Sequence, residues 1–127
     1  MMPPMDEQGS QTVRALQQVQ RDRTEQTWAK LQKHGVTTSS LLALEAHFWS
    51  GTEDGAQRLA RHLERRLAHS VTLRAIRRGF FRRSWAVDAT RPARQTDLDD
   101  IGRWTDRMVE AAVKHDAKFD GWGTFVP

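Results

Sequence analysis

The sequence of 127 residues contains no cysteine, which excludes disulfides, cysteine nucleophiles and thiolate metal sites. No apolar run approaches the ~18 residues that a membrane-spanning helix requires, so we expect no contact with a membrane. The N-terminus lacks a basic region followed by an apolar stretch, which argues against a secretory signal. Together these absences predict a cytoplasmic protein.

Residue groupings typical of catalysis are also missing. The eight glycines are scattered and form no phosphate-binding loop, and none of the five histidines stands in a setting such as Gly-x-Ser-x-Gly. No combination of nucleophile, base and oxyanion donors is visible. We therefore expect a protein that is not an enzyme and that holds no cofactor and no metal.

Arginine, in contrast, is abundant and unevenly distributed. Lysine and arginine number 20 against 16 acidic residues, and the surplus lies between residues 56 and 94. That stretch holds eleven arginines and two acids, Glu64 and Asp88, which gives a local net charge of +9. Such a distribution favours an acidic partner over a basic one.

Two kinds of hydrophobic periodicity alternate along the chain. Alternation with period two predicts strands, and apolar residues at helical spacing predict helices. In chain order the predicted elements are a strand at 42–49, a helix at 56–67, strands at 71–76 and 81–88, a helix at 97–112 and a strand at 118–126. Thr52 or Ser50 is the expected N-cap of the first helix and Thr96 that of the second, and Pro92 is expected in a loop.

This order of elements predicts an α+β fold, a ferredoxin-like βαββαβ sandwich with both helices on one face of an antiparallel sheet. The other face is open, or is covered by a partner or by an additional N-terminal helix. That helix is predicted from Ser10, its N-cap, to Lys33, with Gly35 as a left-handed C-cap. The predicted divisions are a disordered N-terminus (1–9), the N-terminal helix (10–36) and the sandwich domain (37–127).

Glu45 and His47 lie two residues apart on one predicted strand, so their side chains point to the same face of the sheet. A metal-binding or acid–base pair is one interpretation. Because such a site needs more convergent groups, an exposed polar pair is the favoured interpretation.

Five arginines surround the turn predicted at Gly79: Arg74, Arg77, Arg78, Arg82 and Arg83. Such clusters attract phosphate backbones, and ferredoxin-like RNA-recognition domains stack bases on aromatic side chains of the sheet. The RNP1 motif of those domains is missing, because the run from Arg78 to Phe81 matches only its first three positions. The arginines therefore form a surface for RNA, a surface for an acidic protein segment, or a solvated face.

The run Asp120-Gly121-Trp122-Gly123 places a tryptophan between two glycines. Two glycines weaken a strand, so something is expected to compensate for them. Trp122 is either a core side chain, with the glycines providing packing room, or a large apolar contact for a partner.

Residues 117–125 resemble the closing signature of the regulator of ribonuclease activity B (RraB) family, in which Asp-Gly-Trp-Gly-Thr ends the last strand. Weaker similarity covers most of the chain. It includes Arg23-Thr24, Leu31-x-x-His34-Gly35, and the run Ala-Leu-Glu-Ala-His-Phe at 43–48, which is similar to the family's first strand. The resemblance implies a ferredoxin-like domain and a non-enzymatic inhibitor of RNA decay, because the characterised member binds the scaffold region of ribonuclease E.

The chain departs from that characterised member in its charge, since the member is strongly acidic with an acidic tail and this chain is basic. Our leading hypothesis is a regulator of RraB type that binds and inhibits a ribonuclease E-type nuclease or its degradation complex. Its predicted partner-binding residues are Asp120, Gly121, Trp122, Gly123, Glu45 and His47. The alternative is an RNA-binding module that uses the arginine-rich hairpin around Gly79 and the arginine-rich face of the helix predicted at 56–67.

Overall fold

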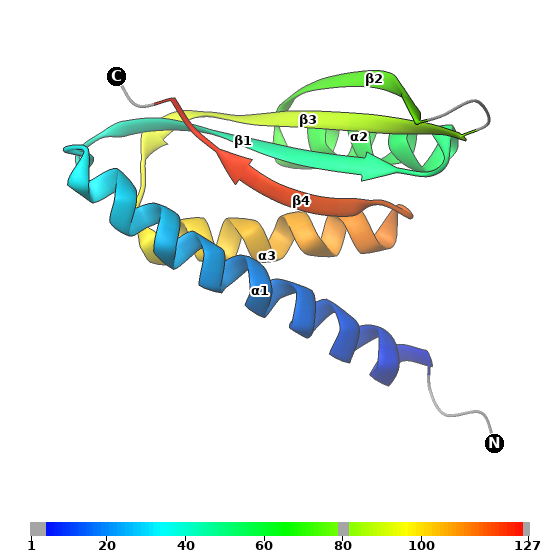
Figure 1. Cartoon of the computed structure of the whole chain (residues 1–127), viewed down its shortest axis with the longest axis horizontal. Coiled ribbons are helices and arrows are strands. Elements are labelled where there is room, and N and C mark those ends of the chain that lie inside the picture. The colour runs from blue at the N-terminus through cyan, green and yellow to red at the C-terminus, as the bar shows by residue number, and fades with distance from the viewer. Residues whose placement is uncertain (1–4, 79–81, 126–127) are drawn as a thin grey trace.

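The computed structural model describes residues 5–78 and 82–125 (Figure 1). Its elements are α1 (Met5–Lys33), β1 (Leu41–Ser50), α2 (Glu53–Leu67), β2 (Ser70–Arg78), β3 (Arg82–Gln95), α3 (Leu98–Lys114) and β4 (Lys118–Gly123). The strands form one antiparallel sheet in the order β2-β3-β1-β4. α2 and α3 each connect two strands that have one other strand between them. The predicted α+β class, with a helix before the sheet, is confirmed.

The alternation in β1 explains the two faces of the sheet. Leu42, Leu44, Ala46 and Phe48 are at most 2% exposed. They form one hydrophobic core with the apolar stripes of α2 and α3, which include Leu59, Leu63, Ile101 and Met108. The intervening residues of β1 point to the opposite face, where the Leu41 side chain is exposed. We call this second surface the open face.

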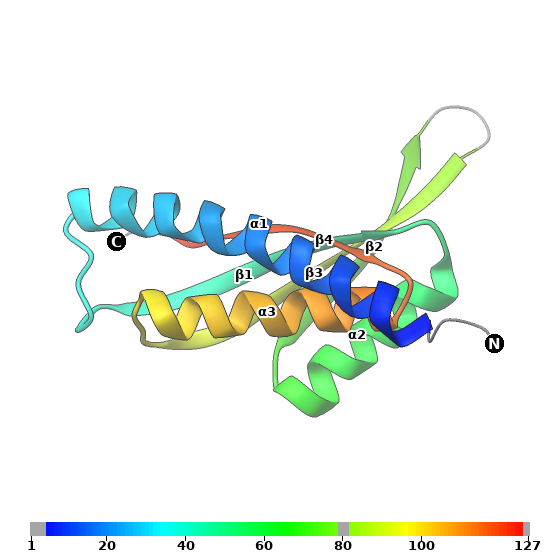
Figure 2. The same cartoon turned by 90° about the horizontal axis from the view of Figure 1, so that it is seen from below.

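α1 extends the helix layer and does not cover the open face. It lies beside α3 (Figure 2), and its Arg21 Nη2 is 2.5 Å from Asp106 Oδ2. Trp28 and Leu31 of α1 are buried in the same core as the sheet and the other two helices. None of the helices in the described part of the chain is long and apolar enough to cross a membrane.

Only the N-terminal end of α1 differs from the prediction. The helix begins at Met5 instead of Ser10, so residues 5–9 are helical where disorder was expected. Residues 1–4, the rest of that expected disordered segment, lie outside the described residues. At the other end, Gly35 adopts φ +93°, the left-handed conformation predicted for the C-cap.

β3 is longer than predicted, and it includes Pro92, for which a loop was expected. Leu42 pairs with Arg94 and Leu44 with Arg91, so two residues of β3 oppose one residue of β1. This bulge interrupts the hydrogen-bond ladder, which is where a strand tolerates a proline that has no N–H. At the other end of the sheet, β4 stops at Gly123, short of the expected residue 126.

Both helices after β1 begin with a side-chain cap. Thr52 Oγ1 accepts a hydrogen bond from the Gly55 amide at 3.1 Å, as predicted for α2. The predicted cap of α3 is wrong by one residue, because the Asp97 carboxylate accepts from the Asp100 amide at 2.7 Å. The Thr96 hydroxyl instead donates to the Asp100 carboxylate at 2.5 Å.

Candidate functional site

The open face carries a cluster of three polar side chains near its centre. His47 Nδ1 lies 2.8 Å from Asp88 Oδ1 and 3.9 Å from Glu45 Oε1. Asp88 stands directly opposite His47 in the β1–β3 register, and Arg74 Nε of β2 lies 3.6 Å from its second carboxylate oxygen. The predicted pair of Glu45 and His47 is therefore part of a larger polar cluster that continues across three strands.

This cluster contains the kinds of atoms that bind a cation. One ligand atom each from Glu45, His47 and Asp88 lies within 4.8 Å of the other two. However, the His47 nitrogen is already paired with Asp88, and Arg74 supplies positive charge beside the same carboxylate. The three side chains and Arg74 therefore form one polar cluster, in which a hydrogen bond joins His47 to Asp88.

The two glycines of the closing motif stand beside this cluster on β4. Gly121 pairs with His47 and Gly123 with Glu45, so β4 presents bare backbone next to both side chains. A Cβ atom added at either glycine would meet nothing within 4 Å. The glycines therefore do not make packing room within this chain, and they leave the edge of the open face unobstructed.

Gly121 also makes a β-bulge possible. Phe48 pairs with Phe119 but His47 pairs with Gly121, so Asp120 is the extra residue. Gly121 adopts φ +128°, a backbone conformation that residues with a Cβ rarely adopt. Without the bulge, Phe119 and Trp122 would point to opposite faces of the sheet, because strand side chains alternate. With it, both aromatic rings pack against the core.

Trp122 lies on the helix side of β4. Its Nε1 donates to Thr24 Oγ1 of α1 at 3.0 Å, and its ring meets that of Trp104 edge-on, with centroids 6.3 Å apart. The side chain is partly buried, whereas Thr24 is almost completely buried. Trp122 thus joins β4 to α1 and α3, while Glu45 occupies the opposite face of the sheet.

A cavity of about 260 Å³ opens between α1 and the edge of β4. It is lined by four of the six predicted partner-binding residues, His47, Asp120, Gly121 and Trp122, together with Gln20, Arg23 and Thr27 of α1. The structure therefore brings most of the predicted set to one place. Glu45 and Gly123 lie one pair further along the β1–β4 ladder.

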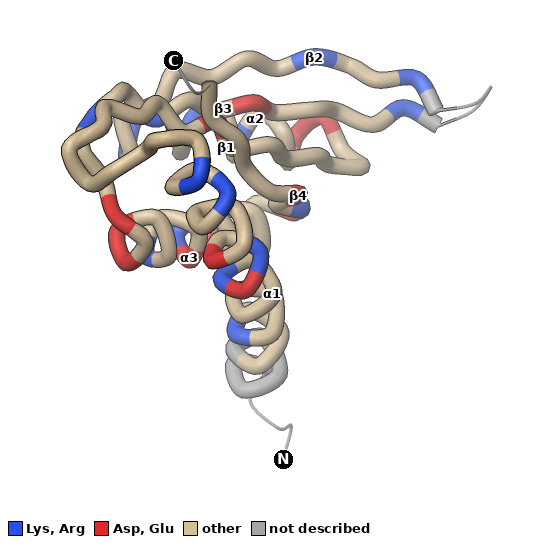
Figure 3. The backbone as a smooth tube through the Cα atoms, turned by 60° about the vertical axis from the view of Figure 1, so that its left-hand side comes forward, with Lys and Arg blue, Asp and Glu red and all other residues tan. Residues whose placement is uncertain are grey.

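The arginines that were predicted to bind an anionic partner lie in the β2–β3 hairpin (Figure 3). Arg77 pairs with Arg83 and Arg78 with Arg82 in the strand register, while residues 79–81 lie outside the described residues. Arg77 and Arg83 are exposed, and neither has an ion pair within the described part of the chain.

Asp88 is the main member of the site that sequence reasoning missed. It lies 41 residues after His47, and only the register between β1 and β3 brings the two together. The alternation of Asp88 with the apolar residues Val87 and Ala89 was a usable signal in the sequence, because it places Asp88 on the face opposite the core. Lys118 was also missed, and its Nζ lies 5.0 Å from the centroid of a Trp49 ring.

These features define a class of protein, a small α+β domain whose sheet has one face covered by helices and one face exposed. The exposed face carries a polar cluster, and a cavity lies at the edge of the sheet beside β4. The family model described as regulator of ribonuclease activity B matches residues 21–124 of the chain. The chain therefore belongs to this family of regulators, and the resemblance seen in its closing motif is confirmed. No curated protein matches the sequence.

Proposed function

We propose that the protein binds an RNA-degrading endoribonuclease of the ribonuclease E type and inhibits it by contact, without catalysis. Membership of a family of ribonuclease regulators supports a nuclease as the partner. The observation that carries the proposal is the accessible backbone of Gly121 and Gly123 beside a polar cluster and a cavity. Bare backbone next to charged side chains allows a partner segment to approach closely.

The charges at this site favour a basic partner segment. The carboxylates of Glu45, Asp88 and Asp120 lie on or beside the open face, and Asp120 has no ion pair within the described residues. Arg23 and Arg74 reduce the negative charge of the site without matching all three carboxylates. The net charge of the chain is +4, but residues 56–94 alone carry +9, so the rest of the chain is acidic. An arginine-rich segment of a nuclease therefore remains compatible with this surface.

The substitution Gly123→Leu tests this proposal by adding bulk opposite Glu45 without disturbing the fold. Gly123 has no neighbour within 4 Å of an added Cβ and no left-handed backbone, so the variant is expected to fold normally. Gly9→Leu in α1 is the matched control, since a Cβ there also meets nothing. We expect Gly123→Leu to weaken binding to the purified nuclease and its inhibition by tenfold or more. Equal binding by the two variants would contradict the proposal.

RNA binding by the hairpin is the second candidate function, because Arg77 and Arg83 are adjacent and exposed and have no ion pair with any described residue. Each phosphate contact with single-stranded RNA contributes roughly 0.7 to the log–log salt slope. Changing both residues to glutamine should lower that slope by about 1.4. The control changes Arg61 and Arg65 of α2 to glutamine. A salt slope of the Arg77 and Arg83 double variant equal to that of the wild type would exclude the hairpin as the RNA site.

A further inference from the structure

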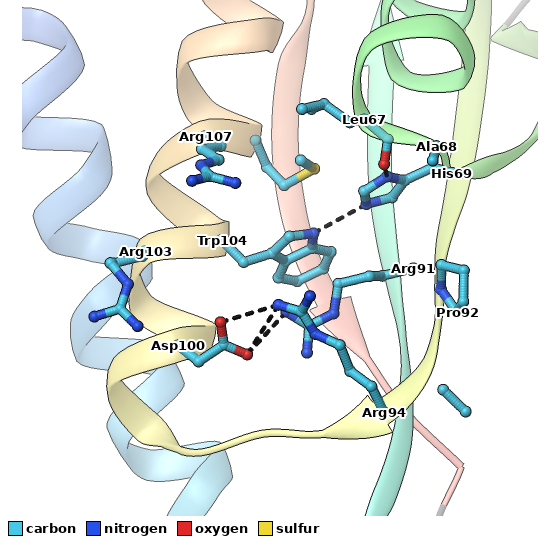
Figure 4. Close-up of a pocket in the computed structure, with 12 residues that line it drawn as sticks. Leu67, Ala68, His69, Arg91, Pro92, Arg94, Asp100, Arg103, Trp104 and Arg107 are labelled. Atoms are coloured by element: carbon cyan, nitrogen blue, oxygen red, sulfur yellow. Dashed lines mark hydrogen bonds and ion pairs between the residues drawn. The ribbon is translucent and has the colours of Figure 1, made fainter.

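A larger cavity lies on the helix side of the sheet, away from the open face. It has a volume of about 580 Å³ and lies between the end of α2, the last part of β3 and α3 (Figure 4). Four arginines line it, Arg91 and Arg94 from β3 and Arg103 and Arg107 from α3. We call this cavity the arginine pocket. Its size lies within the range of about 300–1,000 Å³ that is typical of small-molecule sites.

Arg91 is the residue that most needs an explanation. Its side chain is 6% exposed, and Nη1 donates to Asp100 Oδ2 at 3.1 Å. Nε and Nη2 of the same guanidinium are buried and have no hydrogen-bond partner in the part of the chain that the structure describes. Buried donors of a charged group are rarely left unpaired, because the loss of their hydration is not compensated. Arg91 therefore contributes a buried and incompletely compensated positive charge to the wall of the pocket.

The pocket also has more positive than negative charge. The Asp100 carboxylate pairs with both Arg91 and Arg94, as Figure 4 shows. Arg103 pairs with Asp99 on the outer turn of α3. Arg107 is exposed and has no ion pair among the described residues. The positive charges of Arg91, Arg94 and Arg107 therefore exceed the one negative charge of Asp100. An anionic ligand would neutralise the excess positive charge.

The protonation states within the pocket support this charge balance. Burial opposes ionisation of Asp100, but the Thr96 hydroxyl and the guanidinium groups of Arg91 and Arg94 outweigh it and lower the pKa of the carboxyl. Burial and the neighbouring Arg94 lower the pKa of Arg91 despite Asp100. Asp100 is thus already ionised, and the charge of Arg91 is still not fully compensated.

His69 and Trp104 form another part of the pocket wall, and the nitrogen atoms of both rings already have hydrogen-bond partners. His69 Nδ1 donates to the Leu67 carbonyl oxygen at 2.8 Å, and its Nε2 accepts from Trp104 Nε1 at 3.0 Å. Both ring nitrogens are therefore used, and His69 is a neutral imidazole that orients Trp104. The Trp104 ring lies 5.7 Å from the Arg91 guanidinium carbon, which keeps that guanidinium in place. Ligand recognition is left to the arginines.

We propose that the arginine pocket binds the phosphate group of a phosphorylated small molecule, with Arg94 and Arg107 as donors at the rim and Arg91 as the buried positive charge beneath them. A phosphate monoester carries close to two negative charges at neutral pH and several acceptor oxygens. Guanidinium groups match such oxygens in geometry and charge. The volume of the pocket accommodates the organic part of the ligand as well. The site does not depend on the nuclease contact proposed above.

Calorimetric titration of the full chain tests this proposal, with inorganic phosphate, 5′-AMP and adenosine as probes at constant ionic strength. We expect saturable binding of phosphate and 5′-AMP and none of adenosine. Arg107→Gln should weaken binding of both anions by about tenfold, because a charged hydrogen bond is lost. Arg61→Gln on α2 removes the same charge outside the pocket and should bind as the wild type does.

Three results would overturn the proposal. They are the absence of saturable binding of phosphate and 5′-AMP, adenosine binding equal to that of 5′-AMP, and equal affinities of Arg107→Gln and Arg61→Gln. Arg91→Gln is a further variant, but it alters a buried residue and is informative only if it folds. Arg107 is exposed and unpaired, so its substitution keeps the test independent of stability.

Discussion

Replacing Trp122 by alanine separates a structural role of this side chain from a binding role. The indole contacts the core, meets the Trp104 ring edge-on and donates to Thr24 Oγ1. Truncating a fully buried tryptophan costs about 3–5 kcal/mol of stability. Because Trp122 is partly buried, we expect Trp122→Ala to lower the free energy of unfolding by about 2–3 kcal/mol. That is a large part of the roughly 5–15 kcal/mol that stabilises a domain.

A double-mutant cycle isolates the hydrogen bond between α1 and β4. Trp122→Phe keeps an aromatic ring but removes the indole N–H, and Thr24→Val removes the acceptor at nearly constant volume. We expect each single change to destabilise the protein and the pair to show a coupling free energy of about 1 kcal/mol. A coupling free energy near zero would show that the bond between Nε1 and Oγ1 adds nothing to stability.

Thermal denaturation followed by circular dichroism, combined with nuclease binding by the same variants, measures both roles. A loss of 1 kcal/mol lowers Tm by roughly 3–6 °C in a domain of this size, so Trp122→Ala should lower it by about 10 °C. Below its Tm, the variant should bind the nuclease nearly as well as the wild type. An unchanged Tm with lost binding would refute our reasoning and make Trp122 an anchor for the partner.

The remaining predictions concern pH and the bulge in β4. Burial, with Arg91 and Arg94, lowers the pKa of His69, although the Leu67 carbonyl opposes this. The folded state therefore binds fewer protons, so stability should be full above pH ~6.5 and fall below it. Urea denaturation at pH 7.5 and 5.5 measures this loss of unfolding free energy. His69→Gln should make the loss smaller, by at most about 1.4 kcal/mol per pH unit, and a loss as large as that of the wild type would contradict this reasoning. Gly121→Ala should cost about 1–3 kcal/mol in the same assay and Gly123→Ala far less, whereas equal costs would argue against the bulge.

The parts of the fold that depend on local periodicity could be predicted from the sequence. Alternation in β1 identified the buried face, because Leu42, Leu44 and Phe48 share it. Local chemistry also identified the Thr52 cap and the left-handed conformation of Gly35. These features are determined by residues close together in the chain, so no knowledge of tertiary contacts was needed.

Features that depend on the pairing of strands could not be predicted in the same way. The extra residues in two strands shift the register, and a shift of one residue reverses every side chain beyond it. This is why Pro92 was placed in a loop and why the side of the sheet that Trp122 occupies stayed open. The arginine pocket was missed for a different reason, because Arg91 and Arg107 line one pocket only through the packing of β3 against α3.

The bulge at Gly121 makes one short motif serve the core and the surface at once. It turns Phe119 and Trp122 toward the core, and the same change in register leaves the backbone of Gly123 bare beside Glu45. Substitutions within the motif should therefore differ in kind. Changes at Trp122 should lower stability first, since its contacts are internal. Changes at Gly123 should lower partner binding first, since no described residue lies within 4 Å of a Cβ added there. A motif used only for packing would not show this separation.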